Sequence, residues 1–221
     1  MIAHRIAIAA CIALAIVMLS NSAVANNPIE KPVILVATPE VRGQFFSESI
    51  LIVTPIGNRQ HLGFIINRPT LLTLSEAYPG HEPSKKVTQP IYLGGPVNVG
   101  ELFALVQRQG RADLGGIRLA SDLYLEIERE KVDSVIENER DQARFFAGAV
   151  VWQSGELEAE IQYDFWYVQD ADAGLVLRKS TAGLWEELVR RIEQKRNAIT
   201  AANKLVPAPR AMSPISLTSG N

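Results

Sequence analysis

The chain has 221 residues, of which 47% are hydrophobic and 21% are charged, values that are ordinary for one globular domain of fair size or two small ones. The formal net charge of -2 excludes the strongly basic surface that nucleic-acid-binding domains carry, so we expect no nucleic-acid partner. The single cysteine excludes a disulfide within the chain and any metal site built from several cysteines.

The first 25 residues have the pattern of a secretory signal peptide. His4 and Arg5 precede an almost wholly apolar run at 6–19, and an Ala-Val-Ala sequence at 23–25 supplies a cleavage site. The apolar run is shorter than the roughly 20 residues that span a bilayer, which favours cleavage after Ala25 over a membrane anchor. We therefore expect a periplasmic protein without a stable membrane span, and cleavage also removes the cysteine.

The next part of the chain predicts a lead-in and three strands. Residues 26–32 are polar and contain a proline, so we expect them to be flexible. Short runs rich in β-branched residues predict strands at 33–37, 50–53 and 62–66. The third strand ends at Asn67-Arg68-Pro69, and because a proline restricts the residue before it, Arg68 is held at the strand end.

A glycine-rich corner follows. Thr73 and Glu76 are spaced for a capping box, which predicts one helical turn, and the strand at 91–93 runs into Gly94-Gly95-Pro96. Consecutive glycines permit backbone angles closed to other residues and can leave N–H groups exposed to an oxyanion or a phosphate. A plain tight turn is the alternative. Further strands are predicted at 102–106 and 117–119.

The following segment predicts a helix, a central strand and an acidic stretch. A helix is expected to start at Ser121-Asp122 and to run to about Asn138, and the apolar run 145–152 predicts a buried central strand. In residues 156–161 acidic and apolar residues alternate, so an extended segment would place three carboxylates on one face. These could supply an acid–base pair or a metal site, but a solvated acidic face is the favoured interpretation.

The last part of the chain predicts two strands, a long helix and a tail. The strands are expected at 165–168 and 175–177, on either side of an acidic turn at 170–174. An apolar stripe predicts a helix from 183 to about 202. Residues 204–221 contain prolines and few apolar side chains, which predicts disorder, so the folded domain is expected to span 33–203.

Several motifs in order resemble the YqgE/AlgH family. They are the corners at 63–69 and 94–97, the helix start at 121–122, and the sequences 148–152 and 155–161 followed by Trp166. The resemblance covers about residues 33–194. It implies an α+β domain whose bifurcated, mostly antiparallel sheet forms a pseudo-barrel with a few flanking helices. It also implies a family of proposed transcriptional regulators without an established activity, and it supplies no catalytic residue.

The leading functional hypothesis is an exported, non-catalytic binding or interaction module whose partner is a small anion or a protein. We predict no catalytic residue, no cofactor and no metal, since the two histidines left after cleavage, His61 and His81, are far apart in the sequence. The sequence leaves the oligomeric state open. A cytoplasmic regulator is the alternative if the signal peptide is not used.

The rival hypothesis is a small anion-binding enzyme or hydrolase with its site where strand ends converge. An arginine beside free backbone N–H groups can receive an oxyanion. The alternative for this arginine is a structural ion pair between Arg68 and Glu158, and we prefer it. The candidate ligand-binding residues are Asn67, Arg68, Gly94, Gly95, Glu156 and Glu158.

Overall fold

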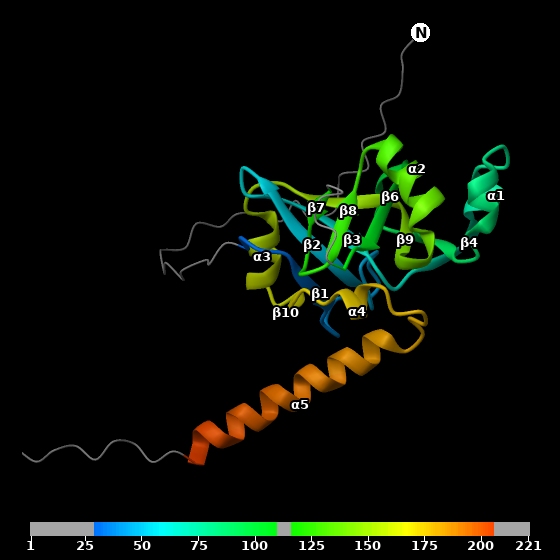
Figure 1. The fold of residues 1–221 in the computed structure, drawn as a ribbon. Coiled ribbons are helices and arrows are strands. Elements are labelled where there is room, and N and C mark those ends of the chain that lie inside the picture. The colour runs from blue at the N-terminus through cyan, green and yellow to red at the C-terminus, as the bar shows by residue number, and fades with distance from the viewer. Residues whose placement is uncertain (1–28, 110–115, 206–221) are drawn as a thin grey trace, which may run out of the picture.

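The computed structural model of the protein describes residues 29–109 and 116–205 (Figure 1). The predicted signal peptide and residues 206–221 of the predicted tail (204–221) lie outside these residues, whereas residues 204 and 205 belong to the last helix. None of the helices in the described part of the chain is long and apolar enough to cross a bilayer. The strands are β1 Val33–Ala37, β2 Ile50–Gly57, β3 Gln60–Ile65, β4 Pro69–Thr73, β5 Pro90–Leu93, β6 Val97–Gln107, β7 Ile117–Arg118, β8 Leu123–Glu126, β9 Ala143–Trp152 and β10 Trp166–Asp170. The helices are α1 Leu74–Ala77, α2 Arg129–Asn138, α3 Glu156–Gln162, α4 Ala173–Val176 and α5 Leu184–Leu205, with 3-10 turns η1 at Glu82–Lys86 and η3 at Arg140–Gln142.

The strands form one curled sheet in the order β10-β1-β2-β3-β9-β6-β8-β7, with β4 and β5 branching from it. The branch is at β9, because one edge of β9 pairs with β5 at Phe146 and Ala147 and then with β3 from Val150 to Trp152. The pairing of β5 with β9 is parallel, and the other ladders among the described strands are antiparallel. The predicted α+β fold with a bifurcated, mostly antiparallel sheet is therefore confirmed.

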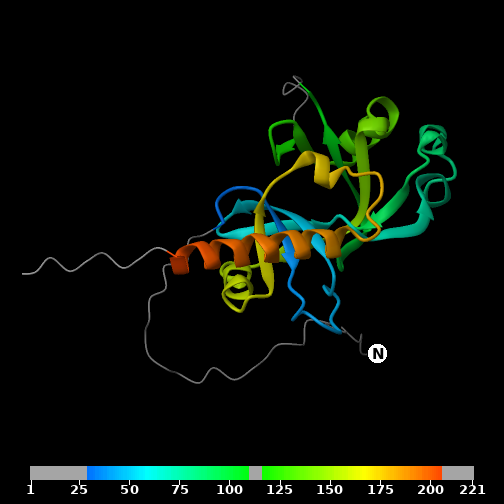
Figure 2. The same cartoon turned by 90° about the horizontal axis from the view of Figure 1, so that it is seen from below.

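Both faces of the sheet are covered at β1, which explains its continuous run of apolar residues. Ile34 and Val36 point into a cluster that includes α5, whereas Leu35 and Ala37 point into a second cluster with Leu157 of α3. Figure 2 shows α5 lying across the strands at this end of the sheet. A strand that is buried on both faces shows no alternation of apolar and polar residues, so its sequence pattern indicates only that the strand is central.

The chain crosses over β9 at the glycine corner between β5 and β6. The N–H of Gly94 donates to the carbonyl of Ala147 at 2.9 Å, and the carbonyl of Gly94 accepts from the N–H of Ile65 at 2.8 Å. A Cβ atom on Gly95 would lie 2.3 Å from the carbonyl carbon and oxygen of Ala149. Only glycine fits such a close approach of two backbones. The corner is thus a crossing point, and the Gly94 N–H is used within the fold.

The helix predicted from Ser121 was wrong in its first part. Residues Leu123 to Glu126 form β8, which pairs with β6 and β7, and the helix α2 begins only at Arg129. All four residues of β8 are buried. Burial on both sides of a sheet outweighs the local helix-start signal, because Ser and Asp serve turns as well as helix caps.

The strand predicted at 175–177 was also wrong, because Ala173–Val176 is the short helix α4. The Asp172 carboxylate accepts hydrogen bonds from the N–H groups of Gly174 and Leu175, at 2.8 and 3.2 Å, and so caps this helix. A local cap decides the conformation of so short a segment.

The acidic stretch at 156–161, expected as an extended segment, forms the helix α3. Leu157 and Ile161, four residues apart, share one helical face and pack on the cluster that contains Trp152. Six alternating residues fit a strand and a short helix equally well, and the strong helix formers Glu, Leu and Ala favour the helix. The three carboxylates therefore do not share one face.

Candidate functional site

The Asn67-Arg68 corner ties the end of β3 to the loop before β2. The Asn67 side chain accepts a hydrogen bond from the N–H of Ile50 at 2.9 Å and donates one to the carbonyl of Glu48 at 2.8 Å. The guanidinium of Arg68 donates to the carbonyl of Ser47 at 2.9 Å. Both polar side chains thus hold the loop before β2 in place, so the role that these contacts show is structural.

Arg68 lies beside the glycine corner, as the rival hypothesis assumed. Its carbonyl accepts from the N–H of Leu93 at 2.9 Å, one residue before Gly94. The guanidinium lies 5.1 Å from the ring centre of Phe45, which is a cation–π distance. Burial lowers the pKa of Arg68, and the negative charge of Glu48 partly offsets this effect. Asn67, Arg68, Gly94 and Gly95 are therefore brought together.

The two candidate glutamates lie elsewhere. Glu158 is buried, and its carboxylate is 4.0 Å from the guanidinium of Arg59, in the turn between β2 and β3. Arg68 follows the opposite end of β3, a six-residue strand about 20 Å long. The expected ion pair between Arg68 and Glu158 is therefore wrong, and Arg59 is the partner. Glu156 accepts from the N–H of Gln153 at 2.8 Å at the start of α3.

Glu160, the third carboxylate of α3, joins two tryptophans. One of its oxygens accepts from the indole N–H of Trp152 at 2.9 Å and from that of Trp166 at 2.7 Å. The three glutamates therefore have three separate surroundings. Within residues 29–109 and 116–205, no group of three or more His, Cys, Asp or Glu is arranged to hold a metal ion. Ligand binding by the six candidate residues stays a prediction.

The two histidines in the described part of the chain, His61 and His81, are held by contacts with the protein. The Nε2 atom of the buried His61 is 2.9 Å from the carbonyl of Ile29, which attaches the described part of the lead-in to β3. The Nδ1 atom of His81 is 2.7 Å from the hydroxyl oxygen of Ser84 in the turn that follows α1. The two rings belong to separate elements and do not form a common site.

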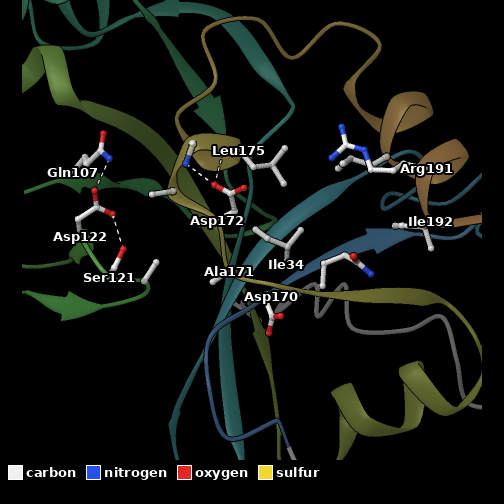
Figure 3. A pocket seen from close by; sticks show the side chains of 15 residues that line it. Ile34, Gln107, Ser121, Asp122, Asp170, Ala171, Asp172, Leu175, Arg191 and Ile192 are labelled. Atoms are coloured by element: carbon white, nitrogen blue, oxygen red, sulfur yellow. Dashed lines mark hydrogen bonds between the residues drawn. The ribbon is translucent and has the colours of Figure 1, made fainter. Parts of the chain in front are cut away.

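A groove of about 750 Å³, which we call the aspartate groove, lies between α5, the β10–α4 connection and the turn before β8 (Figure 3). Its floor includes the apolar side chains of Ile34, Leu188 and Ile192. The charged side chains around this floor are Asp122, Asp170, Asp172 and Arg191. The sequence brought together only the two that share the acidic turn at 170–174, Asp170 and Asp172.

Two of these aspartates hold the walls of the groove in place. The Asp122 carboxylate accepts from the side-chain amide of Gln107 at 2.6 Å, and one oxygen of Asp172 caps α4 (Figure 3). Arg191 donates to Glu187 at 2.6 Å, one turn earlier in α5. The rim is thus built from side chains whose positions are set by hydrogen bonds.

Asp170 already holds a cation. The ammonium of Lys31, from the lead-in, donates to the Asp170 carboxylate at 2.7 Å. This hydrogen bond and the positive charge lower the pKa of Asp170, so the carboxylate is ionised at neutral pH. The side chains of Lys31 and Asp170 are 73% and 87% exposed, and an ion pair so exposed to water exchanges partners readily.

The acidic turn at 170–174 was the one signal for this groove in the sequence. It predicted only a turn, because the other walls come from residues about fifty positions earlier and twenty positions later. A groove of this kind cannot be predicted from the sequence, because it forms only when the fold brings those segments together.

Comparisons with known proteins identify what this chain is similar to. The AlgH-like family model matches residues 34–197. A UPF0301 protein from Chlorobium luteolum is 29% identical over 160 residues, which cover 71% of this chain and 82% of that protein. A UPF0301 protein from Cytophaga hutchinsonii is 28% identical over 166 residues, with coverage of 73% and 89%.

Two solved structures share the fold. The crystal structure of a protein from Corynebacterium diphtheriae aligns with a TM-score of 0.61 and 24% identity, covering 73% of this chain and 86% of that one. The solution structure of the AlgH protein from Pseudomonas aeruginosa aligns with a TM-score of 0.56 and 21% identity, covering 86% and 94%. At these identities the likeness concerns the fold.

Proposed function

The chain belongs to the AlgH-like family, and from this premise and the geometry of the aspartate groove we propose that it is an exported, non-catalytic module that binds a protein partner. The observation that carries the proposal is Asp170 at the edge of the groove, whose carboxylate already binds the ammonium of Lys31 from the neighbouring hollow. The partner is expected to present a basic side chain next to apolar residues.

The groove suits such a side chain in both its parts. Lysine and arginine have an apolar stem and a charged head, and the stem can lie against Leu188 and Ile192 while the head reaches the rim. Because an ion pair so exposed to water contributes little stability, a partner's ammonium can replace that of Lys31.

The rival anion-binding site at Arg68 has less support. The Gly94 N–H donates to Ala147, and the Asn67 side chain is engaged on both its oxygen and its nitrogen. The carboxylate expected as the third member of that site is at the other end of β3. A hydrolase would need groups that these contacts already occupy.

Binding of a basic peptide tests the groove. With an acetylated, amidated Leu-Lys-Leu-Lys peptide as the probe and the full chain in low salt, Asp170→Lys is expected to raise the Kd about tenfold or more, because an attraction becomes a repulsion. Titration calorimetry measures this change. We also expect the affinity to fall as salt is added, since the carboxylate is exposed.

Asp141→Lys is the matched control. Asp141 is exposed in the turn η3, away from the groove, and its replacement alters the net charge by the same amount. An equal loss of affinity in Asp170→Lys and Asp141→Lys would mean that the peptide responds only to the net charge of the protein, and this would contradict the proposal. Absence of binding to the unsubstituted protein would contradict it as well.

Export has its own test. In a Gram-negative host the mature protein is expected in the periplasmic fraction, with Asn26 as its first residue when the N-terminus is sequenced. An intact N-terminal segment on a cytoplasmic protein would contradict export and would favour the regulator hypothesis, while the binding test above would still stand.

A further inference from the structure

A second groove of about 310 Å³, which we call the α2 groove, shares no lining residue with the aspartate groove. It lies between α2, the turn that links α1 to η1, and the first half of β6; Figure 1 shows α1 beside α2. Its lining combines apolar and charged side chains. The members are Tyr78, His81, Gly100, Glu101, Leu102, Ile127, Arg129, Val132, Asp133 and Ile136.

The floor of this groove is apolar. Val132 and Ile136 are four residues apart on α2, and both belong to the buried cluster beneath the helix. Leu102 of β6 packs against the same cluster. Ile127, between β8 and α2, completes the surface, and its side chain is 42% exposed.

The rim carries charges of both signs. Arg129 and Asp133 lie one turn apart on α2, and Glu101 stands on β6. Within residues 29–109 and 116–205, the side chains of these three residues have no hydrogen bond or ion pair with the protein. This differs from the aspartate groove, where each charged rim group has a partner in the chain.

The opposite wall presents a fixed ring. The hydrogen bond between His81 Nδ1 and the Ser84 hydroxyl orients the imidazole, and Ser84 itself is fully buried, so this side of the groove is held in place. A wall whose position is already fixed can bind a ligand without the entropy cost of ordering that wall first.

We propose that the α2 groove binds a small zwitterionic ligand with apolar side chains, of the class of an apolar dipeptide with free termini. The planar guanidinium of Arg129 matches a terminal carboxylate, which it can hold through two parallel hydrogen bonds. The carboxylates of Glu101 and Asp133 supply partners for the terminal ammonium. The apolar floor takes the aliphatic side chains. A ligand with only a positive or only a negative charge would leave the rim groups of one sign without a partner.

Calorimetry on the full chain with leucyl-leucine as the probe tests this proposal. Two derivatives of the probe each remove one terminal charge: N-acetyl-leucyl-leucine lacks the ammonium, and leucyl-leucine amide lacks the carboxylate. Each is expected to bind about tenfold or more weakly than leucyl-leucine, because a charge-assisted contact is lost. Equal binding of all three would mean that the apolar floor alone binds, which overturns the assignment.

Two substitutions locate the site. Arg129→Gln is expected to raise the Kd for leucyl-leucine about tenfold and to leave the Kd for leucyl-leucine amide unchanged, since only the free peptide offers a carboxylate. Ile127→Asp is expected to weaken both, and thermal melts check that it still folds. Glu137→Gln, exposed on the same helix and absent from the groove lining, is the control. No binding to the unsubstituted protein, or unchanged affinity in Arg129→Gln, would overturn the proposal and leave the aspartate groove untouched.

Discussion

Replacement of Gly95 by alanine is expected to lower the free energy of unfolding by about 3 kcal/mol or more. The added Cβ would lie 2.3 Å from the carbonyl carbon and oxygen of Ala149 and 2.6 Å from the nitrogen of Val150. These are backbone atoms of the central strand β9, so no side-chain rotation relieves the overlap. The two backbones must separate, which weakens the pairing of Val97 with Ala149 at the start of β6. Urea unfolding followed by circular dichroism measures the loss.

Gly80→Ala is the matched control for this experiment. A Cβ on Gly80 meets no atom within 4 Å, and its backbone lies outside the left-handed region. We expect this variant to be as stable as the unsubstituted protein or slightly more stable, because alanine reduces the entropy of the unfolded chain. A Gly95→Ala variant as stable as Gly80→Ala would contradict the close crossing of the two backbones.

Arg108→Met is expected to cost about 3–5 kcal/mol of stability. The Arg108 side chain is buried and donates to Glu126 at 2.5 Å and to both oxygens of Glu139, at 2.8 and 2.9 Å. The hydrogen bonds to Glu139 outweigh the effect of burial and raise the pKa of Arg108, so the arginine is charged throughout the accessible pH range. Methionine keeps much of the volume but leaves two buried carboxylates without this cation.

Removal of the two carboxylates identifies the cause of that loss. Glutamine at positions 126 and 139 removes the uncompensated negative charge in Arg108→Met, so part of the deficit relative to the unsubstituted protein is expected to be recovered. Thermal melts of these variants measure the recovery. Arg140→Met, whose guanidinium makes one exposed hydrogen bond to the carbonyl of Glu137, is expected to cost about 1 kcal/mol or less. A deficit that the two glutamines do not reduce would assign the effect to packing instead.

Much of the fold was predictable because its signals are local. The runs 33–37 and 145–152 contain mostly apolar and β-branched residues, and both are central strands. The capping box at Thr73 and Glu76 is present, with the Thr73 N–H donating to the Glu76 carboxylate at 2.8 Å. The apolar stripe of α5 predicted its position. In each case the residues that decide the structure are within a few positions of one another.

The errors in the elements have the same physical origin. Leu123–Glu126 is a strand because β6 and β7 offer hydrogen bonds on its two edges. Both of those strands were predicted, but no local pattern indicated that they would pair with residues 123–126. Residues 156–161 alternate over too short a length to distinguish a period of 2 from one of 3.6. Tertiary contacts override weak local preferences in such segments.

The strand ends were predictable from local patterns, and on that basis the rival hypothesis placed Asn67 and Arg68 near Gly94 and Gly95. The rest of each candidate site depends on how the strands and helices pack. It placed Glu158 at the opposite end of β3 from Arg68, beside Arg59. It also assembled both grooves from distant segments. The physical reason is that strand pairing and helix packing fix which surfaces face each other, and no local pattern of side chains records that choice.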